Sequence, residues 1–222
     1  MGKCYIITAY IDGTLTEIIS PSESDFIICA DGGYEIATSF NIVPHLVIGD
    51  ADSGGVTLIS SDGSKFNSVS NVATSKTEFI RLQTEKDEAD TFVCVQHAVA
   101  LGYDDITIVG GIGGRLDHTV SNIQTLTHFA SKTKRVSFTD ENNFMTVIDN
   151  SNITLPRKEG FSISLFSLSD ICDGVTISGV YYPLTNATLT NTHPLGLSNE
   201  FIEDEAFIEV KDGRLLVIMS RL

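Results

Sequence analysis

Basic residues are scarce in this sequence of 222 residues, which has 14 lysines and arginines against 29 aspartates and glutamates. The formal net charge is therefore -15 at neutral pH. A protein that neutralises a nucleic-acid backbone needs clustered basic side chains, so this composition argues against nucleic acid as a partner. If such an acidic chain handles a polyphosphate, a divalent cation shared by carboxylates and phosphate oxygens would relieve the repulsion between them.

Long apolar runs are also missing, since no stretch reaches the roughly 18 residues that a membrane-spanning helix needs. Residues 1–11 are apolar but have neither a basic run nor a small-residue cleavage site, so we expect a strand there and no secretion signal. The sequence therefore predicts a cytoplasmic protein with no membrane partner. The four cysteines show no metal-binding spacing, and we expect them to be reduced and buried.

Short apolar runs alternate with helical patterns in the first part of the chain, whose overall apolar content of 42% is enough for a core. Such alternation is typical of a mostly parallel sheet with helices on its faces. The sequence thus predicts an α/β N-terminal domain over residues 1–132. The expected strands are residues 26–30, 46–48, 78–82 and 106–109, and the expected helices are residues 34–40, 88–101 and 117–130.

The pattern changes near residues 131–135, after which β-rich runs separated by turn residues dominate. No helical pattern of useful length follows, so we expect a small all-β sandwich or barrel over residues 133–222. Lys211-Asp212-Gly213, between the last two runs, predicts a hairpin. The expected strands are residues 135–139, 144–148, 161–166, 175–180, 206–210 and 215–219.

Acidic residues follow the apolar strands of the first domain directly. Asp31 comes after residues 26–30, and Asp50 and Asp52 come after residues 46–48. In an open α/β sheet, ligands bind beyond the carboxyl ends of the strands, so these aspartates are expected to converge on one rim. Their mutual repulsion favours a bound cation there, although aspartate is also a common residue of simple polar turns.

Residues 86–90, Lys-Asp-Glu-Ala-Asp, open the strongest helical pattern. Asp87 and Asp90 are three residues apart and would share a helix face. Asp87 is also a suitable N-cap, and acids in the first turn favour the helix dipole, so a purely structural role stays open. Lys86 could meet a phosphate as a mobile point charge.

A glycine-rich segment, residues 110–118, joins an expected strand to an expected helix. Its glycines allow a ligand to approach the backbone closely, and the N-terminus of the helix favours anions. Arg115 can bind phosphate oxygens with two parallel hydrogen bonds. The segment is neither a Walker A loop nor a G-x-G-x-x-G fingerprint, because no Gly-Lys-Ser/Thr follows and Leu116 occupies the third glycine position.

Residues 10–16, Tyr-Ile-Asp-Gly-Thr-Leu-Thr, resemble the first motif of haloacid-dehalogenase-type phosphatases. That chemistry requires a nucleophilic aspartate at the first position, where this chain has Tyr10. A phosphatase of this type is therefore a minor alternative.

Taken together, four segments resemble the thiamine pyrophosphokinase family, in its order and at its spacings. They are residues 30–33, 49–53, 86–90 and 110–118, and residues 196–201 resemble a motif of that family's β-domain. The resemblance covers essentially the whole chain. It implies an ATP-binding catalytic domain at residues 1–132, a thiamine-binding and dimerisation sandwich at residues 133–222, and a homodimer.

The resemblance also implies roles for individual residues. The metal site would use Asp50, Asp52 and Asp90 to hold Mg²⁺. The ATP-binding residues would be Asp31, Gly32, Lys86, Asp87, Gly113, Gly114 and Arg115. Thiamine would lie near Asp117, Ser198, Asn199 and Phe201. Catalysis would depend on Asp90, Asp117 and Arg115, with either aspartate as the base that accepts the proton of the attacking hydroxyl.

One position departs from the family pattern, because Ala89 stands where a threonine usually precedes the last aspartate of its motif. This departure leaves a catalytically inactive thiamine or nucleotide sensor as a non-enzymatic alternative. The expected reaction is in-line attack by the thiamine hydroxyl on the β-phosphorus of ATP, with AMP leaving.

Overall fold

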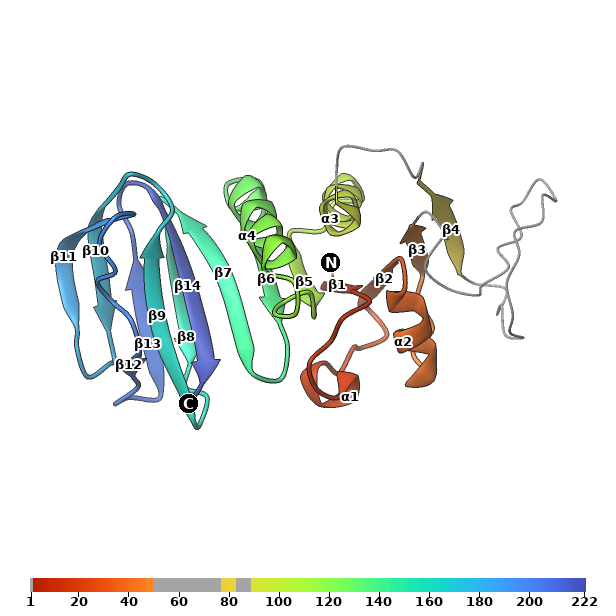
Figure 1. Ribbon diagram of the computed structural model, residues 1–222, viewed down its shortest axis with the longest axis horizontal. Helices are drawn as coiled ribbons and strands as arrows, with labels where there is room; N and C mark the ends of the chain where they lie inside the picture. The colour runs from red at the N-terminus through yellow and green to blue at the C-terminus, as the bar shows by residue number, and fades with distance from the viewer. Residues whose placement is uncertain (1, 50–76, 83–88) are drawn as a thin grey trace. The chain divides into compact units, whose positions relative to one another are not determined.

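The computed structural model of the protein describes residues 2–49, 77–82 and 89–222 (Figure 1). The chain divides into two compact units, Met1–Thr125 and Leu126–Leu222. The division falls within helix α4 (Leu116–Phe129), a few residues before the boundary expected at residue 132. The assignment of ATP and thiamine to separate domains stays a prediction.

The first unit is built on a parallel sheet with the strand order β5-β1-β2-β3-β4. These strands are β1 (Cys4–Ile7), β2 (Phe26–Ala30), β3 (Leu46–Gly49), β4 (Glu78–Arg81) and β5 (Asp105–Val109). Every residue of β1 and β3 is buried. Strands covered on both faces read as continuous apolar runs, which is why these segments are visible in the sequence.

Helices cover both faces of this sheet (Figure 1). Helices α1 (Leu15–Ile18) and α2 (Gly33–Ser39) share an apolar core with alternate residues of β1 and β2, including Tyr5, Ile7 and Cys29. Helix α3 (Asp90–Ala100) packs against β1, β2 and β3. The predicted α/β arrangement is confirmed.

Helix α3 buries Cys94, Val95 and Ala98 completely. The helix ends at Ala100 with Leu101 as its C-cap, and Gly102 follows with a φ of 91°. The Gly102 N–H donates to the Val99 carbonyl and the Tyr103 N–H to the Ala98 carbonyl, which is the Schellman arrangement that a left-handed glycine allows.

The second unit consists of antiparallel strands in two sheets, with the orders β12-β9-β14-β7-β6 and β11-β10-β13-β8. One core contains side chains of both sheets, among them Ile163, Val217, Val175 and Ile208. This part of the chain is therefore a sandwich, as predicted. Its strands are β6 (Arg135–Thr139), β7 (Asn143–Asp149), β8 (Asn152–Pro156), β9 (Phe161–Ser167), β10 (Ile171–Ser178), β11 (Leu184–Thr190), β12 (Asn199–Glu200), β13 (Glu205–Glu209) and β14 (Arg214–Arg221).

The hairpin predicted at Lys211-Asp212-Gly213 is wrong. Strand β13 pairs with β8 and β10, whereas β14 pairs with β7 and β9 in the other sheet. The turn therefore carries the chain from one sheet to the other. Gly213 is needed there for two reasons. Its φ is 107°, and a Cβ atom would lie 2.8 Å from the Ile171 carbonyl oxygen.

The four cysteines are free and buried, as expected. Burial raises the pKa of Cys4 to about 12 and shifts the pKa of Cys29 upward as well. Among the described residues, no helix is both long and apolar enough to cross a membrane.

Candidate active site

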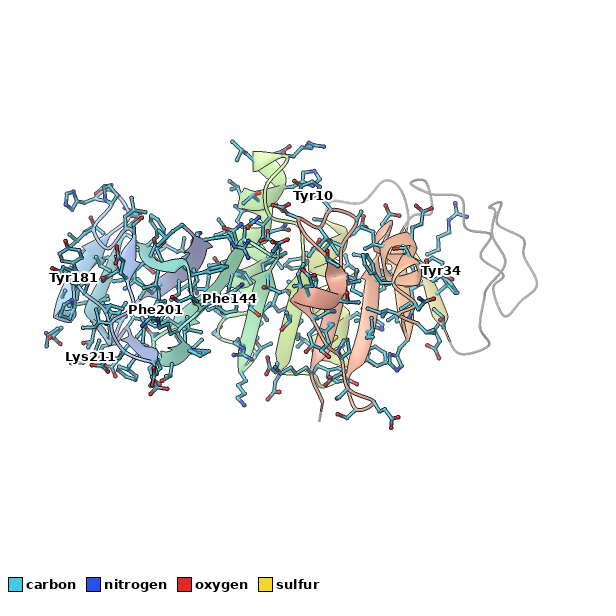
Figure 2. All side chains as sticks on the ribbon, turned by 90° about the horizontal axis from the view of Figure 1, so that it is seen from below. Tyr10, Tyr34, Phe144, Tyr181, Phe201 and Lys211 are labelled. Carbon is cyan, nitrogen blue, oxygen red and sulfur yellow. The ribbon has the colours of Figure 1, made fainter. Side chains whose placement is uncertain are left out.

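A cleft of about 760 Å³ lies at the carboxyl edge of the parallel sheet. Four segments line it: residues 8–10 after β1, Ala30 and Asp31 at the end of β2, residues 89–91 at the start of α3, and part of the glycine segment with the first turns of α4. Tyr10, labelled in Figure 2, belongs to the first of these segments. Separate strand ends thus bring an acidic residue, a helix start and a glycine segment to one cavity.

Asp31 is held in a left-handed backbone conformation, with a φ of 45°. Its N–H donates to the Ile48 carbonyl at 2.8 Å, and its own carbonyl accepts from the Tyr34 N–H at 3.2 Å. Gly49 packs directly against it, because a Cβ atom there would lie 2.9 Å from the Asp31 Cα. Non-glycine residues in this conformation are strained, so holding this carboxylate at the cleft lowers the stability of the fold.

The glycines after Asp31 allow α2 to begin close to the end of β1. A Cβ atom on Gly33 would lie 2.0 Å from the Ile7 carbonyl oxygen, and one on Gly32 would lie 3.1 Å from the Ala9 Cβ. Gly32, a predicted ATP-binding residue, therefore has a packing role. It is not part of the cleft lining.

Asp90 is the first residue of α3 and lines the cleft. Ala89 is the N-cap and makes no side-chain capping bond. The capping role considered for Asp87 is therefore not needed to define the helix start. Asp90 instead places a carboxylate beside the first N–H groups of the helix, where negative charge is favoured.

The segments that follow β1 and β5 are joined by backbone hydrogen bonds. The Tyr10 carbonyl accepts from the Gly111 N–H at 2.8 Å and from the Thr8 hydroxyl at 3.1 Å. A Cβ atom on Gly110 would lie 2.1 Å from that same carbonyl oxygen, and its φ is 83°. Only glycine permits this approach, so Gly110 fixes the segments that follow β1 and β5 relative to each other.

The predicted ATP-binding glycines Gly113 and Gly114 both line the cleft and have positive φ angles. The Gly113 N–H donates to the Thr119 hydroxyl at 3.2 Å. Helix α4 therefore holds the segment that precedes it through its own side chains.

Arg115 lines the cleft and forms two hydrogen bonds with Asp117, from Nε at 3.1 Å and from a terminal nitrogen at 2.5 Å. Both side chains are largely exposed. The guanidinium holds the pKa of Asp117 below its usual value, and the same contact raises the pKa of Arg115. Asp117 lies beside the cleft and is a weak proton acceptor as long as Arg115 stays paired with it.

Four predicted site residues, Asp50, Asp52, Lys86 and Asp87, lie outside the described residues. Within the described part, no group of three or more His, Cys, Asp or Glu side chains forms a metal site. Asp31 and Asp90 nevertheless line the same cleft, and carboxylate oxygens are the ligands that hard divalent cations prefer. The residues present fit a divalent metal ion.

The predicted thiamine residues of the sandwich have structural contacts. Asn199 is buried, and its side-chain amide bonds both the N–H and the carbonyl of Tyr182, at 2.9 and 2.7 Å. The Ser198 N–H donates to the Ser164 hydroxyl, and Ser198 has a φ of 54°. Phe201 belongs to the sandwich core and is 8% exposed, whereas Tyr181 lies on the outer side (Figure 2). Contacts of Ser198, Asn199 and Phe201 with thiamine stay predictions.

The sequence pattern missed two polar residues that line the cleft, Thr8 and Asn122. It also missed Thr119, whose hydroxyl accepts from the Gly113 N–H. The apolar pattern of α4, in which Val120, Ile123, Leu126 and Phe129 recur at helical spacing, predicts a buried Val120, but Val120 is 57% exposed while Asn122 and Thr125 are buried. A search for apolar residues at helical spacing cannot find a polar side chain that is buried because it binds a backbone group of another segment, as Asn122 binds the Gly111 carbonyl. A polar residue at helical spacing from Leu126 and Phe129 was the available signal.

Comparison with known proteins identifies the family of this arrangement. Residues 20–138 match the family model "Thiamin pyrophosphokinase, catalytic domain", and residues 150–215 match "Thiamin pyrophosphokinase, vitamin B1 binding domain". The thiamine pyrophosphokinase of Bacillus subtilis is 30% identical over 139 residues, which is 62% of this chain and 65% of that protein. Thiamin pyrophosphokinase 1 of Caenorhabditis elegans is 21% identical over 97% of this chain and 90% of its own.

Solved structures show the same fold. The crystal structure of the Bacillus subtilis thiamine pyrophosphokinase matches with a TM-score of 0.82 at 24% identity, covering 99% of both chains. The thiamin pyrophosphokinase from Candida albicans matches with a TM-score of 0.72 at 18% identity, covering 100% of this chain and 89% of its own. With a catalytic-domain match over more than half of its residues, this chain belongs to the thiamin pyrophosphokinase family.

Proposed function

We propose that this protein transfers pyrophosphate from ATP to the hydroxyl of thiamine, giving thiamine diphosphate and AMP. The observation that carries the proposal is the single cleft in which Asp31, Asp90, Arg115 and the glycine segment meet, inside the region that matches the family's catalytic domain. Pyrophosphoryl transfer requires positioning and charge neutralisation more than covalent help, and these residues supply both.

The triphosphate would lie along the glycine segment and the start of α4. Gly113 and Gly114 leave room for phosphate oxygens next to the backbone, and the beginning of a helix favours anions. The two-pronged guanidinium of Arg115 matches two oxygens of one phosphate group. Lys86 would add a mobile positive charge.

Asp31 and Asp90 would face the metal ion from within the described cleft, with Asp50 and Asp52 as the other expected carboxylates. We propose Mg²⁺ as the ion. When bound, such an ion neutralises charge on the phosphate oxygens. The carboxylates would hold the ion, and its charge would offset the repulsion between them.

The base that accepts the hydroxyl proton would be Asp90 or Asp117. The Arg115 contact lowers the pKa of Asp117, so Asp117 becomes a better acceptor only when Arg115 turns to a phosphate group. This exchange would couple triphosphate binding to activation of Asp117. Asp90 needs no such exchange, because it already lines the cleft.

The remaining expectations concern assembly and place in the cell. We propose a homodimer in which the sandwich supplies part of the thiamine site through Ser198, Asn199 and Phe201, and a cytoplasmic location. The two alternatives are not favoured. Tyr10 cannot form the aspartyl-phosphate intermediate of the phosphatases. Asp90, one of the two proposed bases, is retained at the cleft, which argues against an inactive sensor.

The test is incubation of the whole protein with ATP, thiamine and Mg²⁺, followed by quantification of AMP and thiamine diphosphate. We expect both products, and none when the metal is chelated. Asp52→Asn should abolish AMP formation without unfolding the chain. Near-normal turnover of that variant would remove Asp52 from the metal site, and hydrolysis of p-nitrophenyl phosphate in place of AMP formation would support the phosphatase alternative.

A further inference from the structure

Asn122 is a buried polar residue on the second turn of α4 that also lines the cleft. Asn122 is 6% exposed, and its Nδ2 donates to the Gly111 carbonyl at 2.6 Å. This bond fixes the orientation of the amide, because only the nitrogen can donate to a carbonyl. Within the part of the chain that the structure describes, Oδ1 accepts no hydrogen bond.

A buried amide oxygen without a donor is unfavourable, since it has lost water and gained nothing in return. Buried polar groups in native proteins are paired in the great majority of cases, and the exceptions require an explanation. At Asn122 the cleft itself supplies one, because a ligand there can provide the missing donor.

The chemistry of Oδ1 restricts what that ligand group is. Ionised phosphate oxygens only accept hydrogen bonds, so the triphosphate is not the partner of a carbonyl oxygen. An amide oxygen is also far too weak a base to take the proton of the attacking hydroxyl. The donors that a substrate can offer are hydroxyl groups and the exocyclic amino group of a heteroaromatic ring. Of these, the amino group has two N–H donors in the plane of a ring and can be replaced by an oxo group in a direct test.

We propose that Asn122 is a specificity-determining residue whose Oδ1 accepts a hydrogen bond from the ring amino group of a substrate. The inference rests on the proposed function, because ATP and thiamine each carry one amino group on a pyrimidine-type ring. A site that pairs with such a group discriminates strongly against an analogue that lacks it, because the buried acceptor is then left without a donor.

A second role of Asn122 must be separated from this one. Its bond to Gly111 and the bond between Thr119 and the Gly113 N–H hold the glycine segment at two points. Both side chains belong to α4, three residues apart, and lie on one helix face. A variant that only loosens the segment should slow turnover of every substrate by a similar factor. Thr119→Val is therefore the matched control, since it removes one anchor and leaves Asn122 intact.

The experiment compares matched substrates in which an oxo group replaces the amino group and the adjacent ring nitrogen carries a hydrogen. Two ratios of kcat/KM are measured, ATP to inosine triphosphate and thiamine to oxythiamine. Each is measured for the full-length wild type, Asn122→Ala and Thr119→Val. We expect Asn122→Ala to reduce one of the two ratios by about tenfold or more, the size of one hydrogen bond to a buried group, and to leave the other unchanged. Thr119→Val should lower all four kcat/KM values together and keep both ratios.

The ratio that changes identifies the source of the amino group as either the nucleobase or the thiamine ring. If Asn122→Ala lowers all four values equally and keeps both wild-type ratios, Asn122 is only an anchor of the glycine segment and the proposal is wrong. Urea unfolding checks that each variant is folded, and Asn122→Ser replaces the alanine variant if that one is not. A wild type that forms no AMP would reject the proposed function itself, so the two failures are distinguishable.

Discussion

Replacing Gly110 by alanine should lower both the stability and the activity of the protein. This glycine allows the segments after β1 and β5 to meet at the cleft. A Cβ atom there would lie 2.1 Å from the Tyr10 carbonyl oxygen and 2.7 Å from the Thr8 hydroxyl. The Tyr10 carbonyl would have to withdraw by about 1 Å to restore ordinary contact, which would break its hydrogen bond from the Gly111 N–H.

The magnitude follows from three contributions. A left-handed φ costs a non-glycine residue about 1 kcal/mol, loss of the hydrogen bond costs about 1 kcal/mol, and relief of the overlap costs about 1 to 3 kcal/mol. The sum is about 3 to 5 kcal/mol in the free energy of unfolding. Because the moved backbone belongs to the cleft, kcat/KM for AMP formation should also fall, by at least about 100-fold.

Gly160→Ala is the matched control. Gly160 has a φ of 73°, but a Cβ atom there would meet nothing within 4 Å. This variant isolates the backbone contribution and should lose only about 1 kcal/mol with normal kcat/KM. Urea unfolding of both variants gives the comparison. Equal losses of stability in the two variants would refute the reasoning, since the close contact at Gly110 would then contribute nothing.

Three further predictions address the site and the core. Arg115→Lys keeps the positive charge but not the two-pronged donor, so kcat/KM for AMP formation should fall by about 100-fold, and an unchanged value would exclude phosphate binding by Arg115. Asp31→Gly relieves the left-handed strain, so the unfolding free energy should stay within about 1 kcal/mol of the wild type while activity is lost; retained activity would remove Asp31 from the site. Burial raises the pKa of Cys4 to about 12 from an ordinary value of 9.0, and that of Cys29 also rises. Thiols of the unfolded chain therefore ionise first as the pH rises above 9, the unfolded state is favoured, and stability should fall more steeply with pH than in Cys4→Val; parallel pH profiles of the two proteins would contradict this.

Much of the first unit could be predicted because its strands are buried on both faces. Residues 26–30 were located to the residue, as β2. In the second unit, residues 135–139 were located equally well, as β6. The position of Asp31 at the cleft followed from the rule that the carboxyl ends of parallel strands share one edge. Asp50 and Asp52, to which the same rule was applied, lie outside the described residues. The glycine segment was recognisable because four glycines before an arginine have little purpose in an ordinary turn.

The remaining features depend on contacts between distant residues. Strand β11 has few buried side chains and β12 is only two residues long, so neither produces an apolar alternation. The turn at Gly213 has the composition of a hairpin, and only the pairing of β13 and β14 with different strands shows that it links two sheets. Asn122 was missed for the same reason, because the Gly111 carbonyl that it binds is 11 positions away.

The central claim is that the β- and γ-phosphates of ATP move together onto thiamine in one step, and it is tested most directly by the fate of the label from [β-³²P]ATP. The proposed reaction predicts that all of the label leaving ATP appears in thiamine diphosphate, with one unlabelled AMP formed for each product molecule. Labelled ADP, or thiamine monophosphate formed in its place, would contradict the account.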